Sequence, residues 1–240
     1  MISIIACTNR KEFVHNIISN FQKQLIQKKE LILIVNSSKF DFKDIEYLFG
    51  RIDFKYKFLH FPSKVSLGEC LNKGVEEASY NYIGKMDDDD LYGPLYLKEG
   101  YETICETNAD VVGKSSFFIY FNSDQELRLY NPKMENRWIL NTGQNVYKSS
   151  YFFSGATLIM KKDVFKRVTF PNVSVGEDSE FQRQCFYGGF KMYSLSKDNY
   201  VYIRYIQTGH HHSDATENLL KRRSCFSAKI PSIEEYFEKN

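Results

Sequence analysis

The chain has 240 residues, a length that fits one large α/β domain or two small ones. Its hydrophobic fraction of 42% and charged fraction of 26% are ordinary for a globular protein and exclude disorder over the whole length. The formal net charge of +2 lacks the basic excess of most nucleic-acid-binding proteins, so we expect no nucleic-acid partner.

Residues 1–90 show an alternation of apolar runs and helical periodicity. Apolar or alternating runs predict strands at residues 2–6, 31–35, 54–61 and 80–86. Apolar residues at helical spacing predict helices at 13–25, 45–49 and 66–78. Strands that alternate with helices indicate an α/β fold with a central, mostly parallel, twisted sheet flanked by helices.

The second half of the chain has a more mixed pattern. A helix is expected from Pro94 to about residue 107, since proline suits a first helical turn, and another at 176–187. Strands are expected at 111–112, 116–121, 127–130, 156–160, 191–195 and 200–205, with a long irregular loop at 131–150. A capping box at 232–235 predicts a helical tail at the end of the chain.

Targeting signals and cysteine pairs are lacking in the sequence. No apolar run reaches the roughly 18 residues that span a bilayer, and residues 1–5 do not resemble a signal peptide. The five cysteines form no Cys-x-x-Cys pair, which argues against structural zinc and a disulfide framework. We therefore expect a cytoplasmic protein, with at most peripheral contact at the inner face of a membrane.

Polar clusters follow three of the predicted strands, at residues 8–10, 36–38 and 87–90. In doubly wound sheets, ligands bind outside the carboxyl ends of the strands. Residues 87–90, here called the acidic segment, are four consecutive aspartates that repel one another unless a cation neutralises them. Asp87 and Asp89 could face the same side and bind Mg²⁺ or Mn²⁺; the alternative is a solvated acidic turn.

Three further features have both a functional and an ordinary interpretation. Glu177 and Asp178 open a predicted helix, where Asp178 is either a helix cap or a general base. Among the consecutive histidines 210–212, one could be a metal ligand, or all three could lie in a solvated loop. Trp138 could stack on a sugar ring or pack in the core.

Taken together, these motifs resemble the nucleotide-sugar glycosyltransferases of family 2, which have the GT-A fold, over about residues 3–213. The resemblance rests on the strand at 3–10, a Gly-x-x-x-Asn-x-Gly helix start at 68–74, an Asp-x-Asp motif in the acidic segment, a Glu-Asp motif at 177–178 and the late histidines. Residues 87–95 further resemble a bacterial subgroup associated with cell-surface or spore-coat polysaccharide.

The resemblance implies a metal-dependent, inverting transfer from a UDP- or dTDP-linked sugar to an acceptor hydroxyl, with Mn²⁺ or Mg²⁺ as the cofactor. The acceptor would be a glycan, a lipid-linked glycan or a protein. Asp178 would be the catalytic base, and Asp89 and His211 the metal ligands. The implied nucleotide-binding residues are Thr8, Asn9, Arg10, Asn36, Asn72, Asp87 and Asp88, and the implied donor and acceptor region contains Gly155, Ala156, Glu177 and Trp138.

The implied organisation is a single domain over residues 1–225, followed by a helical tail at 226–240. Residues 1–107 would form its nucleotide-binding half and 108–225 its acceptor-binding half. Two positions depart from the family pattern: Asn36 stands where an aspartate is common, and Leu71 where an arginine is common. A non-catalytic member that only binds a nucleotide sugar is the alternative function. A sugar nucleotidyltransferase is disfavoured, because residues 7–10 contain no glycine for a phosphate loop.

Overall fold

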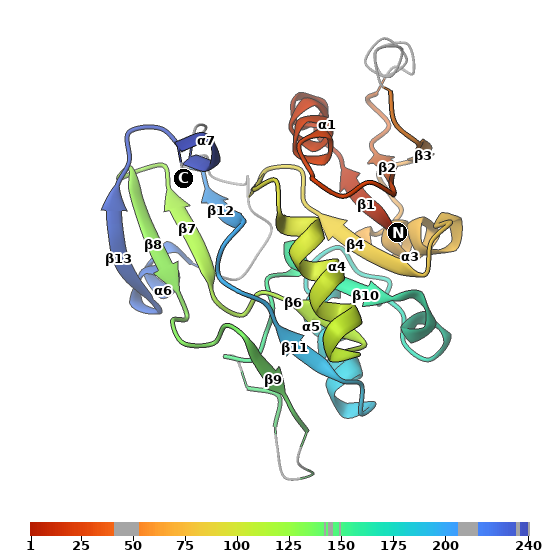
Figure 1. Cartoon of the computed structure of the whole chain (residues 1–240). Helices are drawn as coiled ribbons and strands as arrows, with labels where there is room; N and C mark the ends of the chain where they lie inside the picture. Colours follow the sequence, from red (N-terminus) through yellow and green to blue (C-terminus); the bar gives the residue numbers. More distant parts are fainter. Residues whose placement is uncertain are drawn as a thin grey trace.

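The structure is a computed structural model that describes residues 1–40, 53–141, 143, 146–148, 150–205, 216–233 and 236–239. Its larger sheet contains β1 (Ile2–Thr8), β2 (Lys29–Asn36), β3 (Tyr56–Phe61), β4 (Tyr82–Met86), β6 (Val111–Gly113), β9 (Arg137–Ile139), β10 (Ile159–Lys161) and β11 (Met192–Ser194). The order is β3-β2-β1-β4-β10-β6-β11-β9 (Figure 1). The first four of these strands are mutually parallel, as predicted, while β10 is antiparallel to both its neighbours.

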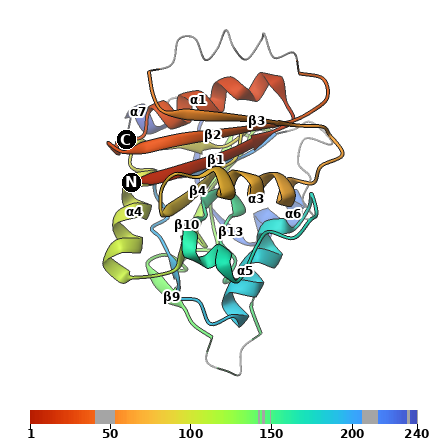
Figure 2. The same ribbon diagram turned by 90° about the vertical axis from the view of Figure 1, so that its right-hand side faces the viewer.

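Helices cover both faces of this sheet. They are α1 (Val14–Gln22), α3 (Leu67–Glu77), α4 (Tyr96–Thr107) and α5 (Glu177–Tyr187). Alternate residues of β1 enter different cores: Ile4 packs in the cluster that contains residues of α1 and α4, and Ile5 in the cluster that contains residues of α3 and α5. Figure 2 shows α1 and α3 on opposite sides of the strands. The predicted doubly wound arrangement is confirmed.

A smaller sheet lies beside the first one (Figure 1). It contains β5 (Leu91–Tyr92), β7 (Phe117–Phe121), β8 (Glu126–Tyr130), β12 (Tyr200–Arg204) and β13 (Ser224–Lys229), in the order β13-β8-β7-β12-β5. Two short helices, α6 (Glu217–Arg222) and α7 (Tyr236–Lys239), accompany it. Among the described residues, no helix has both the length and the apolar character needed to cross a membrane.

The chain crosses between the two sheets several times. The acidic segment makes the first crossing, because it connects β4 in the larger sheet with β5 in the smaller one. Strands from residues 108–225 complete the larger sheet, and β5 from residues 1–107 joins the smaller one. Both predicted halves therefore contribute to both sheets.

Two local predictions are wrong. Residues 226–229 do not belong to a helical tail but to β13, which pairs with β8 and covers an edge of the smaller sheet. Within the loop predicted at 131–150, residues 137–139 form β9, because β11 offers a partner that the local sequence does not reveal. The predicted helix at 45–49 lies outside the described residues.

Candidate active site

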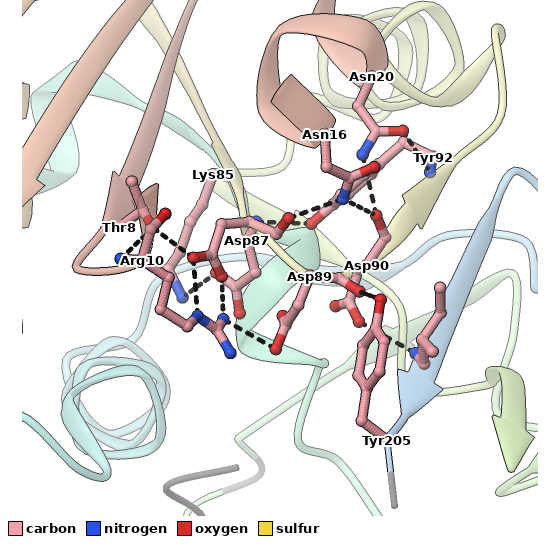
Figure 3. A network of polar contacts seen from close by, with 12 residues as sticks. Thr8, Arg10, Asn16, Asn20, Lys85, Asp87, Asp89, Asp90, Tyr92 and Tyr205 are labelled. Carbon is pink, nitrogen blue, oxygen red and sulfur yellow. Dashed lines mark hydrogen bonds and ion pairs between the residues drawn. The ribbon is translucent and has the colours of Figure 1, made fainter. Parts of the chain in front are cut away.

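The backbone of the acidic segment is fixed by two asparagines of α1 (Figure 3). Asn16 Nδ2 donates to the carbonyl oxygens of Asp88 at 2.7 Å and of Asp90 at 3.0 Å, and Asn20 Nδ2 donates to that of Asp90 at 2.9 Å. Neither residue is among those predicted from the sequence. Their spacing, one helical turn apart next to core positions such as Ile17, was the available signal.

Asp90 holds the acidic segment to the smaller sheet. Its buried carboxylate accepts hydrogen bonds from the Tyr200 hydroxyl at 2.6 Å and from the Ile203 N–H at 3.1 Å, both in β12. Burial, together with the charges of Asp89 and Asp87, raises the pKa of Asp90 well above its ordinary value. Asp90 therefore has a structural role.

Asp88 and Asp89 face the end of β1. The Thr8 hydroxyl and Arg10 Nε both donate to Asp88 Oδ2, the latter at 3.1 Å, and Arg10 Nη2 lies 2.9 Å from Asp89 Oδ2 (Figure 3). Burial raises the pKa of Asp88 to about 6, although Arg10 acts in the opposite direction. Asn9 lies between Thr8, the last residue of β1, and Arg10, and is exposed. The predicted nucleotide-side residues of β1 are thus next to the acidic segment.

Asp87 has a different cationic partner, Lys85. The Lys85 ammonium lies 2.8 Å from Asp87 Oδ1 and 3.9 Å from Glu177 Oε1, and its side chain is only 7% exposed. Burial alone would lower the pKa of Lys85, but Asp87 and Glu177 outweigh burial and hold that pKa above its ordinary value. Burial raises the pKa of Glu177 to about 7. Lys85 is not among the residues predicted from the sequence, where its only signal is a charge within the apolar strand 82–86.

Asp178 lies against the backbone of Gly155. A β-carbon at residue 155 would be 1.8 Å from Asp178 Oδ2, so only a hydrogen fits between them. The helix cap is Gly176, with φ of 78°, and Asp178 Oδ1 accepts the adjacent Ser179 N–H at 2.7 Å. Asp178 therefore does not cap α5, and its carboxylate is directed toward the Gly155 loop.

Tyr92 connects this loop to the acidic segment. Its hydroxyl accepts from the Asp87 N–H at 2.8 Å (Figure 3). The same hydroxyl donates to the Ala156 carbonyl at 2.9 Å. Lys85 connects the acidic segment to the start of α5, because its ammonium lies near both Asp87 and Glu177, the residue before Asp178. The structure thus places the predicted base and the acidic segment in one group.

Replacing Gly155 by alanine tests this contact. The added methyl group would overlap the Asp178 carboxylate, which must then move. If Asp178 is the base that the family resemblance implies, the transfer rate should fall by at least about tenfold, since small misplacements of a catalytic group are costly. UDP affinity should change little. The measurement is the transfer rate and UDP affinity of Gly155→Ala, with circular dichroism to verify folding. An unchanged transfer rate would show that the close contact between Gly155 and Asp178 is not needed for transfer.

Two predicted site residues do not join this group. Both polar atoms of the Asn72 amide bond the backbone of Phe170, at 2.8 and 3.0 Å, so Asn72 anchors a loop. Trp138 lies in β9 against Tyr193, four places from β4 in the sheet order, which is about 19 Å at the usual strand spacing. Because β9 pairs with β11 at the edge of the sheet, Trp138 lies far from the acidic segment.

Two further predicted site residues are Asn36 and His211. Asn36, at the end of β2, donates from Nδ2 to the Val65 carbonyl at 2.8 Å. Its Oδ1 is buried and has no hydrogen-bond partner among the residues that the structure describes. His211, with His210 and His212, lies outside the described residues.

Two carboxylates of the acidic segment have the chemistry of ligands for a divalent cation, although within the described part of the chain no three His, Cys, Asp or Glu side chains gather as a metal site. Asp87 and Asp89 supply hard oxygen ligands of the kind that Mg²⁺ and Mn²⁺ prefer, and the Asp87 side chain is 39% exposed. Arg10, between Asp88 and Asp89, shows that this position already attracts a positive charge. A cation at Asp89 would have to compete with the Arg10 guanidinium.

Comparisons with known proteins bear on the family and the fold of this chain. The sequence model of glycosyl transferase family 2 matches residues 3–169. Glycosyltransferase GlyG of Streptococcus pneumoniae is 23% identical over 210 residues, which cover 84% of this chain and 69% of the relative. TarS of S. aureus, solved with UDP-GlcNAc, has a TM-score of 0.63 at 16% identity, over 86% of this chain and 59% of that one.

A second solved structure is the mannosyltransferase PcManGT of Pyrobaculum calidifontis, in complex with GDP-Man and Mn²⁺. Its TM-score is 0.62 at 14% identity, over 88% of this chain and 58% of that one. The chain thus spans about three fifths of these two solved structures, and the likeness to them concerns the fold. Since the family match covers more than half of the sequence, this chain, with its GT-A fold, belongs to glycosyl transferase family 2.

Proposed function

We propose that this chain transfers a sugar from a nucleoside diphosphate sugar to an acceptor hydroxyl, with inversion at the anomeric carbon. The observation that supports it best is the group formed by the acidic segment, Lys85 and Asp178 around the Gly155 loop. This group combines a site for a charged donor with a carboxylate that can accept a proton. The donors held by TarS and PcManGT, UDP-GlcNAc and GDP-Man, belong to the same chemical class.

In this reaction Asp178 removes the proton of the acceptor hydroxyl as that oxygen attacks the anomeric carbon. Attack opposite the leaving group inverts the configuration. Gly155 leaves the room that the Asp178 carboxylate needs. A divalent cation, Mn²⁺ or Mg²⁺, held by Asp89 and His211, would supply positive charge for the departing diphosphate. Asp87 would hold the ribose.

On the nucleotide side, we propose a uracil or thymine base near the end of β2. The buried Asn36 Oδ1 has no partner among the described residues, and the N3–H of either base is a donor that it can accept. Thr8, Asn9 and Arg10 lie at the end of the neighbouring strand β1. UDP and dTDP are therefore the proposed carriers, with Asp88 positioning Arg10.

The proposed acceptor is a growing surface polysaccharide or spore-coat glycan, free, lipid-linked or on a protein. All five cysteines belong to the described residues and are unpaired there, which suits the reducing cytoplasm. Peripheral contact with the inner face of the membrane would give access to a lipid-linked acceptor.

A thermal-shift screen tests donor recognition. With Mn²⁺ present, UDP or dTDP at a hundredfold excess over its dissociation constant should stabilise the fold by about 2.7 kcal/mol, by mass action. GDP and ADP, which lack a pyrimidine base, are the controls. No shift with any nucleoside diphosphate would refute the proposal. Binding without turnover of any UDP- or dTDP-sugar would favour a non-catalytic nucleotide-sugar-binding protein instead.

A further inference from the structure

Lys85 is a buried lysine in the middle of a sheet, a place where a charge is costly. Its strand neighbours Ile83 and Met86 belong to the apolar cores, and its own N–H donates to the Leu158 carbonyl at 2.8 Å. Lysine is almost never fully buried unless it is paired. An apolar residue at this position would suit the strand better, so the ammonium must serve the groups around it.

The ammonium of Lys85 lies between two motifs that are 90 residues apart in the sequence. Asp87, two residues further along, points to the same side and approaches within 2.8 Å (Figure 3). Glu177, the first residue of α5, is 3.9 Å away, and only 6% of its side chain is exposed. Without the Lys85 ammonium, the carboxylates of Asp87, Glu177 and Asp178 would lie close together around a largely buried Glu177, and they would repel one another.

We propose that Lys85 is a positioning residue that holds the first turn of α5 against the acidic segment, so that Asp178 faces the donor. This inference rests on the proposed function of Asp178 and Asp87. Lys85 acts through Glu177 and Asp87, and it exchanges no proton with the substrates. Loss of its charge should let the start of α5 move away, and displacement of a base by about 1 Å can cost about a hundredfold in rate.

The chain offers a matched control. Lys114 is fully buried, pairs with Glu99 at 3.2 Å and donates to the Ser196 carbonyl at 2.8 Å, so its ammonium has partners outside the catalytic group. Methionine at either position removes a buried ammonium of the same type. A structural role alone predicts the same outcome for Lys85→Met and Lys114→Met, namely lower stability with normal catalysis by the folded fraction.

The experiment compares wild type, Lys85→Met, Lys85→Arg, Lys114→Met and Asp178→Asn by thermal unfolding, UDP affinity, kcat and KM. We expect Lys85→Met to lower kcat by ten- to a hundredfold, Lys85→Arg to recover part of that loss, and Lys114→Met to stay within about twofold of wild type. Hydrogen exchange provides a readout independent of activity: amides of the first turn of α5 should exchange faster in Lys85→Met, while those of its last turn should not. Equal kcat and equal exchange in the two methionine variants would overturn the inference.

A double-mutant cycle combines Lys85→Met with Glu177→Gln. In the single variant Glu177→Gln, Lys85 keeps Asp87 as its ionic partner. If Lys85 acts through Glu177, the kcat losses of the two single variants should not add in the double variant. Should Lys85→Met fail to fold, Glu177→Gln decides the matter, and a near-normal kcat in that variant overturns the inference. A wild type that transfers sugar while Asp178→Asn does not would leave the proposed function intact whatever Lys85 does.

Discussion

Asp178→Asn is expected to lower the rate of sugar transfer by about 10²–10⁴-fold, the usual contribution of a general base. Asparagine keeps the shape of the side chain and can still accept the Ser179 N–H, but it cannot take the proton of the acceptor hydroxyl. Donor affinity should therefore stay within a few-fold of the wild-type value. The measurement is the initial transfer rate and donor affinity of both proteins, or donor hydrolysis until an acceptor is identified.

Glu180→Gln is the matched control for Asp178→Asn. Glu180 lies in the same first turn of α5 but is partly exposed and pairs with Arg183 at 2.9 Å. Removing its charge should leave the transfer rate nearly unchanged. If Asp178→Asn transfers sugar as fast as the control, Asp178 is not the base and the Glu-Asp motif only begins the helix.

Asp89→Ala is expected to abolish Mn²⁺-dependent binding of UDP. The substitution removes the carboxylate proposed to hold the cation, and without that cation the diphosphate would be repelled by the neighbouring carboxylates of Asp87 and Asp88. The fold should survive, because one of four neighbouring like charges is lost and Arg10 keeps Asp88 as a partner. Isothermal calorimetry with UDP, with and without Mn²⁺, measures the effect.

Asp163→Ala is a suitable control for Asp89→Ala. The Asp163 side chain is 80% exposed, and Lys166 is its ionic partner. This variant should bind UDP and Mn²⁺ as the wild type does. Unchanged, metal-dependent UDP affinity in Asp89→Ala would show that the cation is held elsewhere.

Local sequence patterns predicted the parallel strands and the long helices, because these elements depend on periodicity within a few residues. The strand runs at 2–6 and 31–35 and the helix at 176–187 were confirmed. The two-residue strand β5 and the edge strands β9 and β13 were missed, since each exists only through a partner distant in the sequence. Non-local pairing leaves little signal in the strand itself.

The candidate site could be predicted only in part, because the sequence reveals residue types but not the contacts that those residues make. The acidic segment and Asp178 stand out by their residue types, and the structure places both in one group. A motif does not specify what a side chain contacts: the Asn72 amide bonds Phe170 and Trp138 packs on Tyr193. Lys85 was not predicted, because a single lysine in a strand is common and the sequence does not show that this one is buried.

The crossing made by the acidic segment has a consequence for the order of events during folding. Asp90 is bonded by Tyr200 and Ile203, 110 and 113 residues later in the chain, while β4 just before it pairs with β1. Contacts of such long separation form late, because a large loop must close before they become favourable. The four aspartates acquire their final arrangement only when the chain has been synthesised past β12 and both sheets have met. If the proposed nucleotide site is correct, it is a property of the completed fold, because the residues that hold Asp90 come 110 and 113 positions after it in the chain.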